Sequence, residues 1–232
     1  MTVPAMLDHL VYSVPDLDAT VEELAVRLGV WPVFGGRHEG RGTHNALLAL
    51  GEQRYLEIIA RDPSQPDAPT PLPHDLDGLT SPRLVTWAAR ADASHPAGDG
   101  DASHAAGDGD AGNAAGDIEQ RCRAAIAAGV DLIGVRPLSR SLPDGSLLEW
   151  RLTSRPAAGD GLVPFLIDWG AAPHPSANAP GGCRIVGLRA THLDPDRIAS
   201  MLSTLGQSLE VEQGSLALLA TIDSPHGQVT LT

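Results

Sequence analysis

The feature that most constrains the fold is a rhythm of apolar segments that occurs three times along the chain. Each time, a strand-like segment is followed by an amphipathic helical segment and then by about three more strand-like segments. Short runs rich in β-branched and aromatic residues indicate strands, and apolar residues three or four positions apart indicate helices. The helices are expected to begin near Asp16, with Asp16 or Asp18 as the cap, and at Asp117 and Asp194, and to end at glycines. This recurrence predicts an internal structural repeat.

The rhythm divides the chain into three parts, each of which would form a βαβββ module. The first covers residues 1–62, the second 82–170, and the smaller third 183–232. The expected strands are Leu7–Val14, Trp31–Gly36, Asn45–Leu50, Tyr55–Arg61, Arg83–Arg90, Val135–Leu142, Ser146–Ser154, Leu162–Trp169, Arg184–Thr191, Leu209–Gln213, Leu216–Thr221 and Gln228–Thr232. We therefore expect an α+β fold of repeated βαβββ modules. A single α+β domain with a coincidental rhythm is the alternative.

The second module contains an insert of biased composition over residues 91–116. The segment Ala93–Asp101 recurs as Ala102–Asp110, and a shorter, altered copy follows at Ala111–Asp117. Segments of Gly, Ala and Asp without large apolar residues cannot offset the entropy cost of ordering. We therefore expect a solvated, disordered loop, with a metal-binding tract of its His and Asp residues as the alternative.

Charge and composition exclude several kinds of partner. The net charge of the 232-residue chain is -13 and it has no basic cluster, which argues against nucleic acid and an anionic membrane. No apolar run approaches the roughly 20 residues that span a bilayer, and Asp8 and His9 interrupt the apolar start where a signal peptide would lie. Cys122 and Cys183 have no CxxC spacing and indicate no disulfide framework. We expect a cytoplasmic protein with reduced thiols.

Two ionisable residues interrupt apolar strands. Because side chains alternate along a strand, His9 would share a face with Leu7, and Glu57 with Tyr55 and Ile59. A lone imidazole and a lone carboxylate are costly to bury unless they find partners. The pair could form a hydrogen bond with each other, or both could bind a metal ion.

These segments resemble a known group of proteins. The stretch Leu7–Leu17, the turn Arg27–Gly29 and the strand Tyr55–Ile59 resemble the vicinal oxygen chelate superfamily. The segments Gly35–His38, Gly42–Leu48 and Val163–Gly170 resemble, more narrowly, its glyoxalase-like domain proteins. The resemblance covers nearly the whole chain apart from the insert. It implies paired βαβββ modules whose curved mixed sheets form a cup around the site.

In that superfamily a divalent metal is commonly held by the first and last strands of two modules. The resemblance implies His9 and Glu57 as metal ligands from the first module, with Glu57 also as a catalytic base. The second module offers no matching pair: Val85, Thr86 and Trp87 stand where the second His would fall, and Ile167 stands near the place of the second Glu. Asp168 is one residue out of phase and would point to the other face. The candidate third ligands, by residue type only, are His44, His174 and His192.

Two functions are compatible with this resemblance. One is a metal-assisted enzyme of the lyase, isomerase or dioxygenase type on a small oxygenated molecule, with the metal polarising a carbonyl or stabilising an enediolate. The other is a metal-free protein that binds or sequesters a small molecule in the same cup, and the half-empty ligand set favours binding or a divergent activity over glyoxalase chemistry itself. Arg37 at the mouth, with His44, Asn45 and Trp87 on the strands, is expected to contact the substrate. The substrate, the identity of the metal and a homodimeric assembly are left open.

Overall fold

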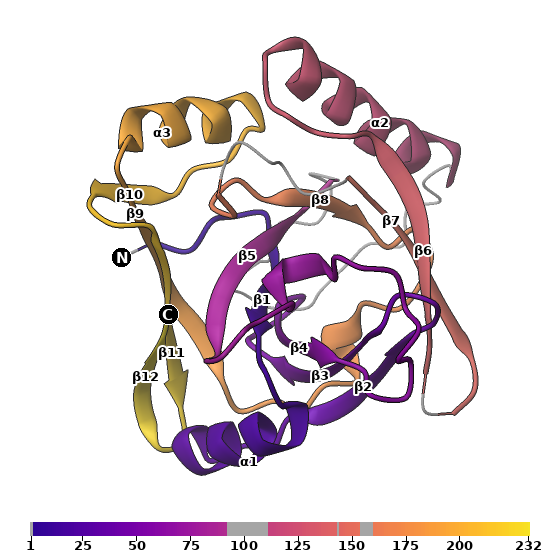
Figure 1. Cartoon of the computed structure of the whole chain (residues 1–232). Helices are drawn as coiled ribbons and strands as arrows, with labels where there is room; N and C mark the ends of the chain where they lie inside the picture. Colours follow the sequence, from indigo (N-terminus) through magenta and orange to yellow (C-terminus); the bar gives the residue numbers. More distant parts are fainter. Residues whose placement is uncertain (1, 92–110, 143, 154–159) are drawn as a thin grey trace, which may run out of the picture.

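The computed structural model describes residues 2–91, 111–142, 144–153 and 160–232, and within these ranges eight strands close into a barrel (Figure 1). The order around the barrel is β1-β4-β3-β2-β6-β7-β8-β5. The barrel strands are β1 (Leu7–Ser13), β2 (Val33–His38), β3 (Thr43–Ala49), β4 (Tyr55–Arg61), β5 (Arg83–Arg90), β6 (Val135–Ser141), β7 (Leu147–Thr153) and β8 (Phe165–Asp168). A separate sheet, in the order β10-β9-β11-β12, contains β9 (Arg184–His192), β10 (Glu210–Gln213), β11 (Ala217–Ser224) and β12 (Gly227–Leu231).

Three α-helices of the described ranges lie outside the barrel (Figure 1). The helix α1 (Leu17–Leu28) contacts β3, β4 and β12, α2 (Ala111–Ala127) contacts β6, β7 and β8, and α3 (Pro195–Thr204) contacts β9 and β10. Each helix follows one strand and precedes three, so the predicted α+β fold of repeated βαβββ units is confirmed. Two short 3-10 turns, Pro73–Asp75 and Pro175–Ala177, lie in connecting segments. None of the described helices is both long and apolar enough to cross a bilayer.

The first strand joins two repeats into one barrel. On one side β1 pairs in parallel with β4 of its own repeat, and on the other it pairs antiparallel with β5 of the next repeat. The second repeat mirrors this, since β5 pairs in parallel with β8. Closure leaves no free strand edge within the barrel, and its interior is the cup that the family resemblance implied.

The predicted caps set the ends of α1 and α3, whereas α2 begins earlier than predicted. Asp16 Oδ1 accepts a hydrogen bond from the Ala19 amide at 3.0 Å, and Gly29 closes α1 in the left-handed region with φ 74°. Asp194 caps α3 in the same way. Correcting the expected start at Asp117, α2 begins at Ala111. Residues 92–110 of the predicted disordered insert lie outside the described residues.

The glycine-rich segment after α1 corrects a second expectation. A strand was expected to end at Gly36, with Arg37 at the mouth of the cup beyond it, but β2 continues to His38. A register shift between Phe34 and Gly36 inserts an extra residue opposite β3, which is a β-bulge. Gly36 adopts φ 146°, a conformation that a side chain would disfavour, and this allows the strand to continue.

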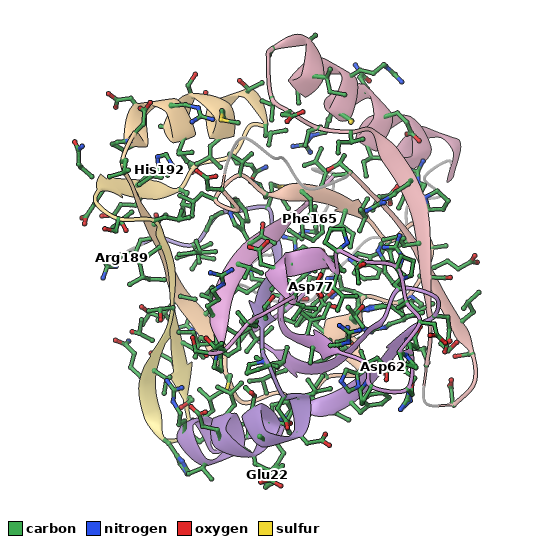
Figure 2. The ribbon with its side chains drawn as sticks, in the orientation of Figure 1. Glu22, Asp62, Asp77, Phe165, Arg189 and His192 are labelled. Carbon is green, nitrogen blue, oxygen red and sulfur yellow. The ribbon has the colours of Figure 1, made fainter. Side chains whose placement is uncertain are left out.

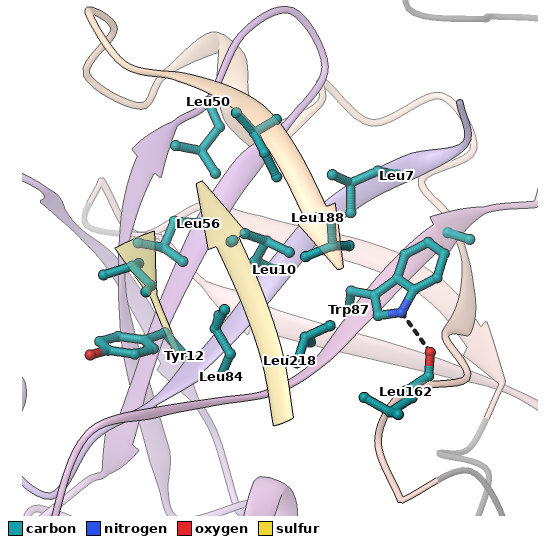
Figure 3. Close-up of a cluster of buried hydrophobic side chains, with 14 of the residues drawn as sticks. Leu7, Leu10, Tyr12, Leu50, Leu56, Leu84, Trp87, Leu162, Leu188 and Leu218 are labelled. Atoms are coloured by element: carbon teal, nitrogen blue, oxygen red, sulfur yellow. Dashed lines mark hydrogen bonds between the residues drawn. The ribbon is translucent and has the colours of Figure 1, made fainter. Parts of the chain in front are cut away.

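The sheet β9–β12 packs on the outer face of the barrel (Figure 3). Leu188 of β9 and Leu218 of β11 lie against Leu10 and Leu56 of the barrel strands. These side chains belong to one buried cluster that also includes residues of all three helices. The third repeat is therefore part of the folded core, and this outer cluster contains most of the apolar area that stabilises the fold.

Candidate functional site

A cavity of about 410 Å³ opens inside the barrel. It is lined by residues of several barrel strands and of the Pro73–Asp75 turn. Part of its wall is apolar and aromatic, including Phe165, Trp150 and Trp169, and Phe165 lies near the centre of the barrel in Figure 2. The volume falls in the lower part of the range of roughly 300–1,000 Å³ that is usual for small-molecule sites. The cavity therefore suits a small ligand.

His9 lies on the cavity wall at a bulge in β1. The pairing with β5 shifts by one residue between Leu7 and His9. The shift corrects the expectation that these two residues share a face: Leu7 joins the outer cluster, whereas His9 lines the cavity. The ring of His9 stacks on Tyr55, with 4.6 Å between ring centroids. The bulge thus aims the imidazole inward, as bulges near functional sites commonly do.

Asp8 orients the His9 ring from behind. Its Oδ1 lies 2.7 Å from Nδ1 of His9, and its Oδ2 lies 3.2 Å from Nε2 of His174 and 3.1 Å from Nε1 of Trp169. Although burial alone would raise the pKa of Asp8, the hydrogen bonds from His174 and His9 hold it well below its usual range. An ionised carboxylate can only accept, so Nδ1 of His9 is the donor and Nε2 faces the cavity. The sequence reasoning did not single out Asp8 for this role.

Glu57 lies beside His9, on the neighbouring strand β4, and is held by Asn45. Oε2 of Glu57 lies 3.8 Å from Nε2 of His9, too long for the direct hydrogen bond considered from the sequence. The Asn45 amide donates to Oε1 of Glu57 at 2.6 Å, and Arg140 donates to Oδ1 of Asn45 at 3.1 Å. Burial would raise the pKa of Glu57, but the nearby histidines and the Asn45 hydrogen bond lower it below its usual value. Glu57 is therefore a charged, oriented carboxylate.

Gly35 makes room for this arrangement. A Cβ atom at Gly35 would lie 2.5 Å from Oδ1 of Asn45 and 2.8 Å from Leu47. Any larger residue would therefore displace the amide that orients Glu57.

His38 is a third polar group at the same end of the cavity. Its Nδ1 lies 2.8 Å from Oγ1 of Thr43, and its Nε2 lies 3.9 Å from Oε1 of Glu57. Burial lowers the pKa of His38 to about 4, although Glu57 opposes the shift, so the ring is neutral near pH 7. His38 was not among the predicted site residues, because the strand was expected to end at Gly36. Gly36 and His38 are two positions apart, so a strand that continued past Gly36 would place both residues on the same face. This spacing was the signal that could have indicated His38.

The donor atoms are compatible with a divalent ion between His9 and Glu57. An ion that makes bonds of about 2.1 Å can bridge two ligand atoms that are up to about 4.2 Å apart. Nε2 of His9 and Oε2 of Glu57 are 3.8 Å apart, within this limit. Asp8 behind the imidazole is the usual outer partner of a metal-binding histidine. Within the described ranges no group of three or more His, Cys, Asp or Glu side chains is placed to hold one ion together. Such an ion would therefore keep several water ligands.

The remaining candidates from the sequence lie in other places. Asn45 is buried beside Glu57, but Arg37 is half-exposed and pairs with Asp62 at 3.3 Å, outside the cavity wall. His44 lies on the opposite face of β3, near the Phe34 ring. Trp87 is fully buried in the outer cluster, where its Nε1 donates to the Leu162 carbonyl at 2.8 Å (Figure 3). Side-chain alternation and the bulge in β5 direct these three residues away from the cavity.

The other two histidine candidates do not contact Glu57, and the second module supplies no second pair of ligands in the described residues. His174 contacts Asp8 rather than Glu57, and the Ser176 amide donates to its Nδ1, so its Nε2 carries the hydrogen that Asp8 accepts. His192 lies on the separate sheet beside Asp160. Ile167 lines the cavity where a second Glu was considered, and Asp168 pairs with Arg151 on the other face, as its phase predicted.

Three arginines on the cavity wall were also missed. Arg41 precedes β3, and Arg136 and Arg140 lie on one face of β6. In the sequence Arg41 lies far from Arg136 and Arg140, and only the pairing of β2 with β6 brings them together.

Comparison with known proteins defines the class of protein. Residues 7–206 match the family model described as Glyoxalase-like domain, and the chain belongs to this family. This confirms the resemblance to glyoxalase-like proteins of the vicinal oxygen chelate superfamily. The comparison with curated proteins gives no match.

Solved structures include several similar chains. A hypothetical protein from Staphylococcus aureus is 12% identical with a TM-score of 0.63, and the alignment covers 91% of this chain and 87% of that chain. A methylmalonyl-CoA epimerase from Mycobacterium tuberculosis is 22% identical with a TM-score of 0.40, covering 76% of this chain and 95% of that chain. A variant of the Streptomyces coelicolor epimerase, in complex with 2-nitronate-propionyl-CoA, is 19% identical with a TM-score of 0.42, covering 71% and 97%. The first of these shows a shared fold.

Proposed function

We propose that this glyoxalase-like protein is an enzyme that moves a proton on a small oxygenated molecule bound in the barrel cavity. The observation that supports this is the pair formed by Nε2 of His9 and Oε2 of Glu57, 3.8 Å apart on the cavity wall. Each group is held from behind by a buried partner, Asp8 in one case and Asn45 in the other. Two oriented groups that can accept or donate protons at one point are the requirement for general acid–base catalysis.

The two groups differ in role. The lowered pKa of Glu57 keeps it ionised, so it would act as the base that removes a proton from carbon. His9 has only Nε2 directed to the cavity, and because Nδ1 donates to Asp8, Nε2 carries the lone pair of the neutral ring and would accept the proton of a substrate hydroxyl group. In the metal-bound alternative, Nε2 of His9 and Glu57 would instead hold a divalent ion, which would polarise a substrate oxygen in place of the His9 contact. The apolar part of the wall limits water and strengthens these interactions.

The test is hydrogen exchange from carbon. The protein is incubated in heavy water with small 2-oxo acids, 2-hydroxy ketones and 1,3-dicarbonyl compounds, with and without manganese, and loss of the C–H signal is followed by NMR. We expect exchange with at least one compound, and a rate at least about 100-fold lower in Glu57→Gln. Glu149→Gln, at an exposed position of β7, is the matched control and should exchange like the wild type.

The alternative function is metal-free binding of a small molecule. The aromatic side chains Trp150, Phe165 and Trp169 favour it, because they offer contact area without chemistry. Binding of a compound without any exchange, and with equal affinity in the wild type and Glu57→Gln, would support this alternative against the enzyme.

A further inference from the structure

We propose that Arg41, Arg136 and Arg140 form a subsite that binds the carboxylate of a small organic acid within the barrel cavity. The inference deepens the proposed function and rests on its premise that this cavity holds the reacting molecule. It assigns a class of ligand to a part of the wall that shares only Arg140 with the hydrogen bonds that hold Glu57.

The three arginines approach the cavity from neighbouring segments. Arg136 and Arg140 lie four residues apart on β6, with Leu138 between them on the same face, and all three line the cavity. Arg41 reaches the same wall from the turn between β2 and β3. Since β2 and β6 are neighbours in the barrel, the cations lie along one side of the cavity.

These cations have no carboxylate partners in the described part of the chain. No ion pair within 4.0 Å joins Arg41, Arg136 or Arg140 to a described Asp or Glu. Seven other arginines do form such pairs: Arg27, Arg37, Arg61, Arg83, Arg151, Arg184 and Arg189. The whole chain has a net charge of -13, whereas these unpaired cations make one wall of the cavity locally positive.

Arg41 and Arg136 also repel each other. Burial, together with the charge of Arg136, lowers the pKa of Arg41. Like charges held close without a counterion are unfavourable, and an anion between them removes the repulsion. Every cationic residue in the sequence is an arginine, and the guanidinium fork matches the two oxygens of a carboxylate.

Arg140 and Trp150 add buried donors that lack acceptors. Arg140 is only 4% exposed, and its Nε has no hydrogen-bond partner among the described residues, although its Nη1 bonds Asn45. Trp150 is 9% exposed and its Nε1 is equally unpaired within the described ranges. Both residues line the cavity. Because these groups only donate and their nitrogens are shielded in this structure, a ligand that satisfies them must bring acceptor atoms as the two side chains turn towards it.

The rest of the lining indicates an organic acid rather than a bare inorganic anion. Leu138, Phe165 and Ile167 present carbon surface that an inorganic oxyanion would leave uncovered. Glu57, which Asn45 links to Arg140, repels a carboxylate, so the acid group is directed towards Arg136 and Arg41. The carbon next to a carbonyl or hydroxyl group is then free to face His9 and Glu57.

The experiment compares acids with their neutral amides by calorimetry on the full chain. Benzoate is measured against benzamide, and pyruvate against pyruvamide, with inorganic phosphate as an oxyanion without a carbon body. At least one acid should bind about tenfold or more tightly than its amide, and its affinity should fall as salt is raised. Arg136→Gln and Arg41→Gln should each weaken the acid about tenfold and leave the amide unchanged. Arg189→Gln is the matched control because it removes the same charge on β9, away from the barrel interior (Figure 2).

Several outcomes overturn the subsite. Acids and amides of equal affinity, or equal losses in Arg136→Gln and Arg189→Gln, contradict it, and phosphate binding as tightly as the acids contradicts the organic-acid class. Arg136 is exposed and Arg41 is only partly buried, so loss of folding is not expected from either variant, and circular dichroism checks this. Glu57→Gln separates the two proposals. The subsite predicts that the acid still binds to this variant, at least as tightly as to the wild type, whereas the proposed function predicts that exchange is lost.

Discussion

The Asp8 carboxylate lies directly behind the His9 ring, with 2.7 Å between Oδ1 and Nδ1, and both side chains are buried. Neighbouring residues on a regular strand point to opposite faces, so this contact depends on the bulge between Leu7 and His9. The bulge fixes which imidazole nitrogen reaches the cavity. The orientation of His9 is thus set by one irregularity in β1.

Replacing Asp8 by Asn should destabilise the protein and loosen His9. The variant keeps the size of the side chain but removes the charge that accepts from His9, His174 and Trp169, and we expect a loss on the order of 2–3 kcal/mol. Urea unfolding measures the loss. Asp18→Asn, at an exposed position of α1, is the control, and an equal effect in both variants would contradict the role given to Asp8.

A divalent ion should bind weakly between His9 and Glu57. Calorimetric titration of zinc, nickel, manganese and magnesium should give heat with at least one ion, and a chelator should reverse it, because two protein ligands make a weak site. The heat should disappear in His9→Ala and in Glu57→Gln. His226→Ala removes an exposed histidine and should bind as the wild type does. Heat that is absent from the wild type, or unchanged in His9→Ala, would show that the pair is not a metal site.

Gly35→Ala should impair the site more than its size suggests. The added methyl group would meet Oδ1 of Asn45 at 2.5 Å, and relieving the clash moves the amide away from Glu57. We expect a loss of stability of about 1–3 kcal/mol, together with weaker ion binding in the titration above. Gly181→Ala is the control, since its Cβ would have no neighbour within 4 Å and its φ is not positive. If both variants behave alike, the close approach at Gly35 has no functional consequence.

The burial of His38 should make stability depend on pH. Its pKa is 6.5 in the unfolded chain and about 4 in the folded one, because burial disfavours the imidazolium. Between these values the unfolded state binds more protons, so stability is complete above pH 6.5 and falls as the pH drops towards 4. The fall amounts to about 3 kcal/mol. Urea unfolding with a chelator, from about pH 7.5 to about pH 5, should show a shallower fall in His38→Gln than in the wild type. Parallel curves would contradict this assignment.

The sequence predicted the architecture better than the site, for physical reasons that particular residues illustrate. Helix caps such as Asp16 and Gly29 are local devices, so their effect can be read from a few neighbouring residues. The strand Tyr55–Arg61 was predicted with its observed bounds because its apolar run is short and well delimited. Alternation along that strand also gives the inward direction of Glu57.

The remaining site residues depend on irregular or long-range features. Asp8 and Trp87 lie beside bulges in β1 and β5, where counting alternate residues fails. Arg140 bonds to Asn45, which lies 95 positions away in the sequence. The two residues meet because β2 pairs with β6, and that pairing is seen at one register position, Arg37 with Ser141. A local pattern carries no signal for either effect. The grouping of Arg41, Arg136 and Arg140 on the cavity wall could therefore be recognised only from the closed barrel of the structure.

The separation of the two apolar clusters bears on how this protein can change over evolution. Leu10 and Tyr12 of β1 belong to the outer cluster, while Val11 between them belongs to the smaller cluster beside the cavity. Substitutions that reshape the cavity therefore leave most of the stabilising contacts untouched, because those contacts lie on the other side of the same strands. A lineage with this fold can drift from one ligand to another and remain folded at each step.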